Sequence, residues 1–119
     1  MIQKTSILGT SDITGVITVN CFHLYQNKKK KHTGFGRFIK ISTRCVLSAY
    51  RKLRKKKFKA IVILLKYNFI KPDSSSIKFK KNTCIILKRR VIALSKLVTG
   101  VCPYNLRRKK FLTSFPKII

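Results

Sequence analysis

Acidic residues are almost missing from this sequence. Its 119 residues include 29 Lys and Arg but only two carboxylate side chains, Asp12 and Asp73, so the formal net charge is +27. General acid–base catalysis usually requires a positioned carboxylate or histidine. Both aspartates fall in predicted turns, where we expect them to accept hydrogen bonds from their own backbone. The sequence therefore predicts that the protein is not an enzyme.

Long apolar runs are missing too. The longest is Ala60–Leu65, far shorter than the ~20 residues that a membrane-spanning helix needs. Yet 45% of the residues are hydrophobic, which is too many for a disordered basic tail. We infer a single folded domain over residues 1–119 with a cationic coat. The commonest polyanionic partner of such a coat is nucleic acid, and we predict no membrane partner.

Cysteine motifs typical of metal sites are absent as well. The four cysteines are Cys21, Cys45, Cys84 and Cys102. No two of them have C-x-x-C spacing, so we interpret them as reduced structural thiols. Cys21, His23 and His32 are a conceivable metal-binding group, but nothing in their spacing favours it. The sequence predicts neither a metal nor a cofactor.

Hydrophobic alternation predicts several short β-strands. They lie near Thr5–Leu8 and in Gly15–Tyr25, Arg37–Thr43, 58–65, 77–80 and 84–87. Alternation places Ile17, Val19 and Cys21 on one face of their strand, and Ile39 and Ile41 on one face of theirs. The segments 58–65 and 84–87 are continuously apolar, so we expect both of their faces to be covered.

Turn residues separate these strands, and the last quarter of the chain has a different character. Gly15, the Gly34–Gly36 segment and Lys71–Ser74 all have turn chemistry. Five or six short strands at this spacing predict a mainly β protein, a small barrel or a sandwich, over residues 1–90. Residues 91–119 are expected to form an extension with one or two short helices. Pro103 is well suited to begin a helix over Pro103–Leu112.

The positive charge is gathered in the connections between strands. The candidate nucleic-acid-binding residues are Lys28, Lys29, Lys30, Lys31, His32, Arg37, Arg44, Arg51, Lys52, Arg54, Lys55, Lys56, Lys57, Lys71, Lys78 and Lys80. Lys and Arg release counterions when they bind along a polyphosphate backbone, and Arg adds bidentate contacts. Tyr25 and Tyr50 are candidates for stacking on bases. Phe35 and Phe58 are better interpreted as closing the ends of the barrel.

Seven strings in a fixed order resemble a known family. They are MIQ, SDITG, HTGFGRFIKIS, KAIVILLK, KPDSSSIKF, NTCIILK and LRRKKF, running from Met1 to about Phe111. Together they resemble the universal large-subunit ribosomal protein fourteen. The resemblance implies a closed five-stranded β-barrel with a C-terminal part that carries short helices. It also implies one copy per ribosome, bound to large-subunit rRNA at the subunit interface.

The same resemblance implies further partners. They are small-subunit rRNA through intersubunit bridges, large-subunit protein nineteen and, in many members, the ribosomal silencing factor. The residues expected at this interface are Ser95, Lys96, Arg107, Arg108 and Lys110. Two departures bear on the resemblance. Ser74 stands where the family turn usually has Gly, and the acidic residues common in the final helix are replaced by Arg108 and Lys109.

The composition also bears on the source of the chain. It is rich in Ile and Lys and has no Glu, as expected of an AT-biased organellar genome. We therefore predict a mitochondrial ribosome, with a plastid or bacterial ribosome as the alternative. Two other functions stay open from the sequence: a free single-strand RNA-binding or RNA-chaperone barrel, and a cationic protein of the membrane surface.

Overall fold

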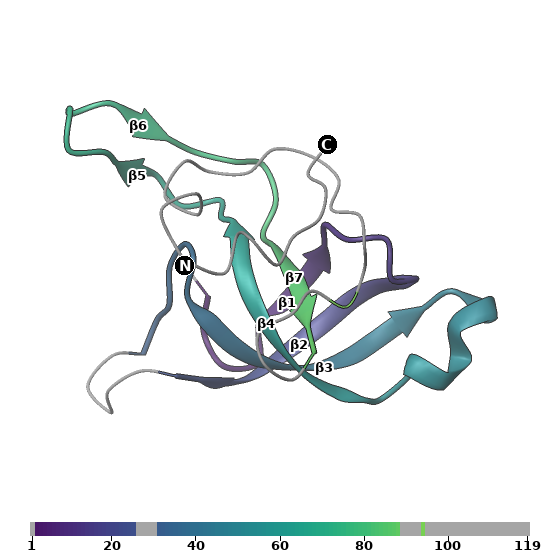
Figure 1. Ribbon diagram of the computed structural model, residues 1–119. Helices are drawn as coiled ribbons and strands as arrows, with labels where there is room; N and C mark the ends of the chain where they lie inside the picture. The colour runs from purple at the N-terminus through teal and green to yellow at the C-terminus, as the bar shows by residue number, and fades with distance from the viewer. Residues whose placement is uncertain (1, 26–30, 89–93, 95–119) are drawn as a thin grey trace.

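The strands form a closed barrel with one projecting hairpin (Figure 1). The computed structural model describes residues 2–25, 31–88 and 94. Its elements are β1 (Ile7–Thr10), β2 (Val16–Leu24), β3 (Phe38–Val46), the 3₁₀ helix η1 (Ser48–Leu53), β4 (Lys57–Leu64), β5 (Phe69–Ile70), β6 (Ser76–Ile77) and β7 (Thr83–Leu87). The barrel has the strand order β1-β2-β3-β4-β7, and β5 and β6 form a separate two-stranded sheet. The expected five-stranded closed barrel is confirmed, and the sandwich alternative is wrong.

The barrel closes where its first and last strands meet. β1 and β7 pair in parallel, with Gly9 opposite Thr83 and Thr10 opposite Cys84, whereas the other four pairs of neighbouring strands are antiparallel. A closed barrel leaves no strand edge free for pairing with another chain. The charged surface of this protein is therefore carried by a structure that satisfies its own backbone.

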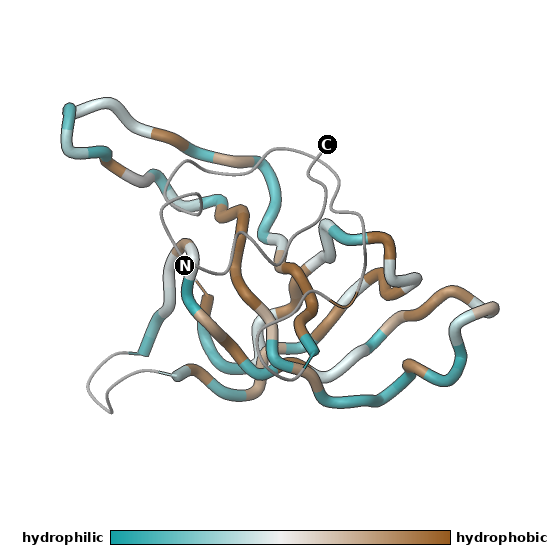
Figure 2. The backbone as a smooth tube through the Cα atoms, viewed as in Figure 1, coloured by the Kyte–Doolittle hydropathy of each residue, from teal (hydrophilic) through white to brown (hydrophobic). Residues whose placement is uncertain are grey.

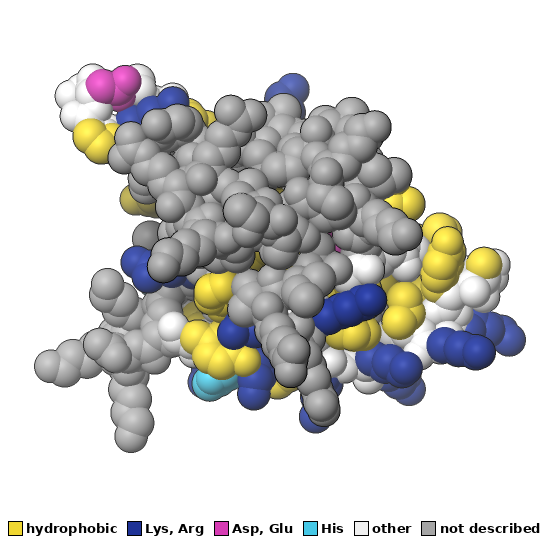
Figure 3. All heavy atoms as spheres, viewed as in Figure 1, with side chains coloured by type: hydrophobic (Ala, Val, Ile, Leu, Met, Phe, Trp, Pro, Cys, Tyr) yellow, Lys and Arg dark blue, Asp and Glu magenta, His cyan; other side chains and the backbone are white. Residues whose placement is uncertain are grey.

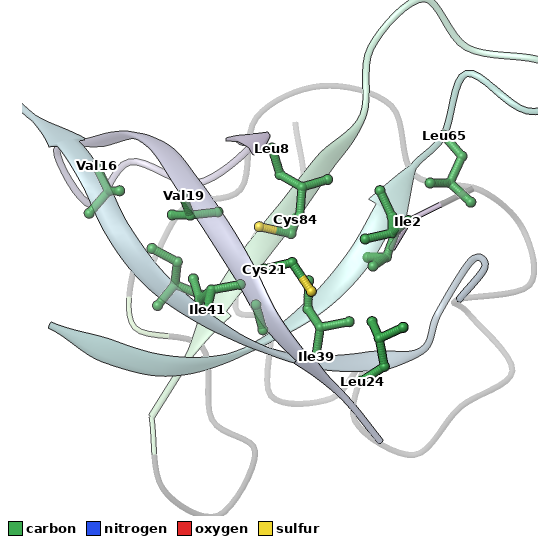
Figure 4. Packing of buried hydrophobic residues seen from close by; sticks show 13 residues of the cluster. Ile2, Leu8, Val16, Val19, Cys21, Leu24, Ile39, Ile41, Leu65 and Cys84 are labelled. Atoms are coloured by element: carbon green, nitrogen blue, oxygen red, sulfur yellow. The ribbon is translucent and has the colours of Figure 1, made fainter. Parts of the chain in front are cut away.

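Branched aliphatic side chains fill the interior. The buried cluster consists of Ile2, Leu8, Val16, Val19, Cys21, Leu24, Ile39, Ile41, Ala60, Val62, Leu65, Cys84 and Ile86. Figure 4 shows them converging from all five strands, and Figure 2 shows the hydrophobic colour concentrated on β4 and β7. The predicted inward positions Ile39 and Ile41 are confirmed. Phe35 and Phe58 are partly buried against this cluster, as expected of residues that close the barrel.

β4 and β7 are buried on both faces, as their continuous apolar sequence predicts. Ala60 and Val62 belong to the interior cluster, but Ile61 and Ile63, which alternate with them, are also fully buried. The same holds for β7, where all five residues from Thr83 to Leu87 are buried. Double-sided burial stabilises these two strands more than the single-sided strands.

One predicted face is wrong at Ile17. Its side chain is 50% exposed, whereas Val16, Val19 and Cys21 are buried. The register between β2 and β3 shifts at two places between Val16 and Val19. Across this irregular pairing Ile17 lies outward, and Val16 takes the interior position instead. Strict alternation from the sequence cannot anticipate such a shift.

Two strand boundaries also differ from the prediction. The first strand begins at Ile7 rather than near Thr5, where a positive φ of 71° interrupts the extended backbone. The alternation over 77–80 yields only the two-residue strand β6, which pairs with the unanticipated β5. The C-terminal extension, the helix over Pro103–Leu112 and Cys102 lie outside the described residues. The division of the chain at residue 90 therefore stays a prediction.

The turn between β5 and β6 keeps a left-handed residue. Ser74 has φ 71°, so the replacement of glycine by serine does not remove the positive-φ turn of the family. The Ser74 amide donates to the Lys71 carbonyl at 3.0 Å, and the Lys71 amide donates to Ser75 at 2.7 Å. The Asp73 carboxylate accepts bonds from the amide and the hydroxyl of Ser75. The predicted turn role of Asp73 is confirmed.

Asp12 hydrogen-bonds its own backbone, as predicted, but it also has a role that the sequence did not predict. It is buried, and its carboxylate accepts a hydrogen bond from the Ile86 amide at 3.1 Å and another from the Thr14 hydroxyl at 3.2 Å. Burial raises its pKa to about 6, although these hydrogen bonds oppose the rise. Asp12 thus joins the end of β1 to β7. Its carboxylate accepts the hydrogen bond of the Ile86 amide in place of a backbone carbonyl of the short first strand.

Candidate nucleic-acid interface

The densest exposed charge lies between β3 and β4. We call residues 47–56 the β3–β4 connection. Its exposed cations are Arg51, Lys52, Arg54, Lys55 and Lys56. Figure 3 shows Lys and Arg side chains gathered at this end of the molecule. The sequence predicts that Arg44 and the run 51–59 fill this connection, which is wrong at both ends, because Arg44 lies in β3 and Lys57 and Lys59 lie in β4. Arg44 and Lys57 are exposed on their strands.

Hydrogen bonds to Thr43 of β3 fix the β3–β4 connection to the barrel. The Thr43 hydroxyl donates to the Leu53 carbonyl and accepts from the Lys56 amide at 3.1 Å. The Thr43 amide donates to the Lys56 carbonyl at 2.9 Å, and the Leu53 side chain packs against the core. Lys55 adopts φ 56°, which turns the chain back toward β4. Neighbouring cations are therefore kept close together although they repel one another.

The N-terminal end of the connection packs against the turn between β1 and β2. The Leu47 amide donates to the Gly15 carbonyl at 2.8 Å. A Cβ on Gly15 would lie 2.3 Å from Cδ2 of Tyr50, so the ring occupies the space that a side chain would need. Gly15 also has φ +81°, which favours glycine. Tyr50, a predicted stacking residue, thus has a packing role, although its side chain remains 44% exposed.

Neither acidic side chain neutralises this connection. Asp12 is buried against β7, and Asp73 accepts hydrogen bonds within its own turn, where they lower its pKa. In Figure 3 the acidic side chain visible at the β5–β6 turn lies far from the basic end of the barrel. Solvated protein surfaces normally mix charges of both signs. An external polyanion is the ordinary way to compensate so one-sided a surface.

Other predicted cations lie on separate parts of the surface. Lys78 and Lys80 are exposed and Lys71 is partly exposed, on or beside the projecting hairpin. Lys31 and His32 are exposed just before Thr33, whose backbone exchanges two hydrogen bonds with Ile2. Arg37 is exposed at the start of β3. These residues do not form one compact site with the β3–β4 connection.

A second group of cations was not recognised as a group from the sequence. We name Phe22, Tyr25, Phe38, Lys40, Lys57 and Lys59 the aromatic–lysine patch. It lies on the outer side of β2, β3 and β4. Alternation had placed Lys40 outward, but only the pairing of three strands brings it beside Lys59 and the rings. The sequence interpretation placed Lys57 and Lys59 in the basic run 51–59 and named Tyr25 as a stacking candidate, but it did not bring these residues together with Lys40.

The side chains of the patch contact one another through cation–π geometry. The Lys59 ammonium lies 4.5 Å from the Phe38 ring centroid and 5.1 Å from that of Tyr25. The Lys40 ammonium lies 5.7 Å from the Tyr25 centroid, and the Lys57 ammonium is 5.8 Å from that of Phe22. Such contacts contribute about 0.5–1 kcal/mol each at exposed positions. They hold the lysines over the rings in the absence of an anion.

An open depression lies in the same patch. It has a volume of about 330 Å³ and is lined by Phe22, Tyr25, Lys40, Lys57, Phe58 and Lys59. Rings and ammonium groups therefore face the same space. This combination suits a ligand with a flat aromatic part and an anionic part.

The whole chain matches one protein family. The model of that family, ribosomal protein L14p/L23e, matches residues 1–119. The chain belongs to the ribosomal protein L14p/L23e family. It is similar to the large ribosomal subunit protein uL14m of Tetrahymena pyriformis, with 39% identity over 115 residues that cover 97% of each chain. The family resemblance in the sequence is thus confirmed.

Several expected sites of this L14p/L23e chain lie outside the described residues. They are Lys28, Lys29 and Lys30 of the predicted RNA-binding set, and Ser95, Lys96, Arg107, Arg108 and Lys110 of the predicted interface. Their roles stay predictions. The described residues therefore include only those predicted contact residues that lie in or beside the barrel.

The thiols of this L14p/L23e chain have structural surroundings. Cys21 and Cys84 are buried and Cys45 is exposed, all three free of disulfides. Burial raises the pKa of the Cys21 and Cys84 thiols, which disfavours the reactive thiolate. The Cys21 thiol donates to the His23 carbonyl at 3.8 Å. Among residues 2–25, 31–88 and 94, no three His, Cys, Asp or Glu side chains are grouped to hold a metal ion.

In the part of the chain that the structure describes, no helix is long and apolar enough to cross a membrane.

Proposed function

We propose that this chain is a structural component of the large subunit of a mitochondrial ribosome and binds its rRNA. The match to the L14p/L23e family over residues 1–119 carries this proposal. The similar protein of Tetrahymena pyriformis is a large-subunit protein, uL14m, and its name is that of a mitochondrial ribosomal protein. The role is structural rather than enzymatic.

The β3–β4 connection supports the rRNA part of the proposal. Its five exposed cations are held on a rigid barrel and receive no counter-ion from Asp12 or Asp73. In water, neighbouring like charges at ~6 Å repel by roughly 0.7 kcal/mol before screening. rRNA phosphates against this connection would replace that repulsion by attraction and release counterions. The projecting β5–β6 hairpin would add Lys71, Lys78 and Lys80 to the contact.

The interface partners belong to the same proposal. The family resemblance implies bridges to small-subunit rRNA, contact with large-subunit protein nineteen and docking of the silencing factor. We assign these contacts to the segment that contains Ser95, Lys96, Arg107, Arg108 and Lys110, with one copy of the chain in each ribosome. The basic character of Arg108 and Lys109 favours an RNA neighbour over an acidic-helix contact at that position.

Sedimentation tests the proposal. A tagged chain expressed in mitochondria should migrate with the large subunit after a high-salt wash, in one copy per particle. A free RNA chaperone would instead bind many RNAs without fixed stoichiometry and leave the particle when salt is raised. Recovery of the chain mainly in the unassembled fraction would contradict the ribosomal role.

A charge variant tests the β3–β4 connection separately. Replacing Arg51, Lys52, Arg54 and Lys55 by Gln should weaken binding to purified large-subunit rRNA and lower the slope of log K against log salt by about 3, since each phosphate contact contributes roughly 0.7–0.9. The matched control, Arg51→Lys with Arg54→Lys, keeps the charge and should keep the slope. An unchanged slope in the four-residue variant would exclude this connection from the interface.

A further inference from the structure

We propose that the aromatic–lysine patch binds one unpaired nucleotide of RNA, with the base stacked on Tyr25 and a phosphate held between Lys40 and Lys59. The inference rests on the proposed function, because it names the part of the RNA that this surface takes. It concerns the outer face of β2, β3 and β4, next to the β3–β4 connection, which ends one residue before Lys57 of the patch.

Two lysines are placed where a single anion can reach both. Lys40 on β3 lies directly opposite Lys59 on β4 in the antiparallel register. Like charges directly opposite one another destabilise a sheet. Both ammonium groups nevertheless converge on the Tyr25 ring, at 5.7 and 5.1 Å from its centroid. A phosphate between them would relieve the repulsion and give each lysine a charge-assisted hydrogen bond.

Two aromatic rings lie at the surface beside these lysines. Phe22 is 40% exposed and Tyr25 is 44% exposed. A lysine occupies part of a ring face only through a weak cation–π contact. When the lysines move to a phosphate, the ring becomes open to a base, and every base has a face that can stack. Stacking and charge neutralisation then support each other in one ligand.

The size and rigidity of the patch favour a single nucleotide. Its depression of about 330 Å³ lies at the small end of ligand pockets, which span roughly 300–1,000 Å³. The backbones of Lys40 and Lys59 lie in paired strands of a closed barrel, so the spacing of their Cα atoms is set before binding, while their side chains can turn from the ring to a phosphate.

Duplex RNA and acidic peptides would contact the lysines of this patch but would not stack on its aromatic rings. A duplex presents phosphates, but its bases are stacked inside and cannot reach a protein ring. An acidic peptide offers carboxylates to the lysines but gives the exposed rings no stacking partner of comparable area. An unpaired nucleotide supplies both parts, which is why we favour it.

The test compares single-stranded and duplex RNA on the full chain. Fluorescence anisotropy measures the affinity for a short oligouridylate and for a duplex of the same length. Tyr25→Leu should weaken binding of the single strand about 10-fold and leave the duplex affinity unchanged, because stacking on one ring contributes on that scale. Tyr67→Leu makes the same change at another exposed tyrosine, 52% exposed, and should have no effect. Thermal melting verifies that both variants fold.

The salt dependence separates the rings from the lysines. Tyr25→Leu should leave the slope of log K against log salt unchanged, because no phosphate contact is lost. Lys40→Gln with Lys59→Gln should lower the single-strand slope by about 0.7, since the one phosphate contact that the two lysines share is lost. Lys66→Gln with Lys81→Gln is the charge-matched control, at two exposed lysines outside the patch.

Definite outcomes would overturn the inference. Equal losses for Tyr25→Leu and Tyr67→Leu, or an equal loss for duplex and single strand, would exclude a stacking site. Binding of a polyglutamate peptide that depends on Tyr25, when RNA binding does not, would assign the patch to a protein partner. A wild-type chain that sediments with the large subunit while Tyr25 has no effect would refute this inference alone. A wild-type chain that does not sediment there would refute the proposed function instead.

Discussion

The barrel and the β5–β6 hairpin are built in opposite ways. The barrel strands bury both Ile39 and Ile41 completely, whereas Ile70 in β5 is 69% exposed. The hairpin strands have two residues each and depend on the hydrogen bonds of their turn. Figure 1 shows the hairpin projecting away from the barrel. The comparison teaches that the same residue type stabilises the fold in one region and only forms surface in the other.

The largest effect is expected in the barrel. Ile41→Ala removes a fully buried side chain from the interior cluster and leaves a cavity. It should lower the free energy of unfolding by about 2–5 kcal/mol. Urea denaturation of the full chain at moderate salt measures this. Ile70→Ala makes the same chemical change in the hairpin and should shift the free energy by less than about 0.5 kcal/mol. Similar losses in the two variants would show that the hairpin is part of the folding core.

The second effect depends on the barrel closure and on pH. The pKa of Asp12 is about 6 in the folded chain because burial disfavours its charge, and it is near 4 when unfolded. The folded state therefore holds the proton more tightly. Stability should be highest below about pH 4 and fall by up to about 3 kcal/mol as the pH rises to 6 and above.

Thermal melts from pH 4 to pH 7 measure this dependence. Asp12→Asn should flatten the profile, because no proton is then released on going to neutral pH. Asp73→Asn is the control: Asp73 is exposed and its pKa is lowered, so its titration falls below this window and has the opposite sign. A fall that survives in Asp12→Asn would place its origin elsewhere in the chain.

The smallest effect is expected at the hairpin turn. Ser74→Gly removes the Cβ penalty at φ 71° and should stabilise the turn locally by up to about 1 kcal/mol. Hydrogen exchange of the Lys71 amide, which donates to Ser75 at 2.7 Å, should slow several-fold. The global unfolding midpoint should stay constant, since the hairpin opens independently of the barrel. A shift in that midpoint would instead couple the turn to the barrel.

Alternation and continuous apolar runs predicted most of the barrel, for reasons that are local. Ile39 and Ile41 lie inward and β4 and β7 are covered on both faces, because side chains alternate along a strand and a run without polar residues cannot face water. The prediction failed at Ile17, where the pairing of β2 with β3 shifts its register. Register is a relation between two strands, and the sequence of one strand alone does not determine it.

The candidate interface also has one part that the sequence shows locally and one part that only strand pairing creates. The cations of the β3–β4 connection are contiguous in sequence and were found there. Lys40 is an isolated lysine in an alternating strand and Lys59 ends the basic run 51–59, so nothing connects them until β3 and β4 pair. Their convergence on Tyr25 therefore had no signal in the sequence beyond an outward-facing position for Lys40.

The sequence by itself determined a basic, acid-poor β-barrel chain and its membership of a ribosomal family, because charge, alternation and motif order are properties of the chain read in one dimension. The tertiary structure alone decided that Asp12 would close the barrel onto Ile86, and that three lysines and three aromatic rings would share one depression. Both depend on residues distant in sequence being brought within hydrogen-bonding or van der Waals distance, and only the closed arrangement of strands does that.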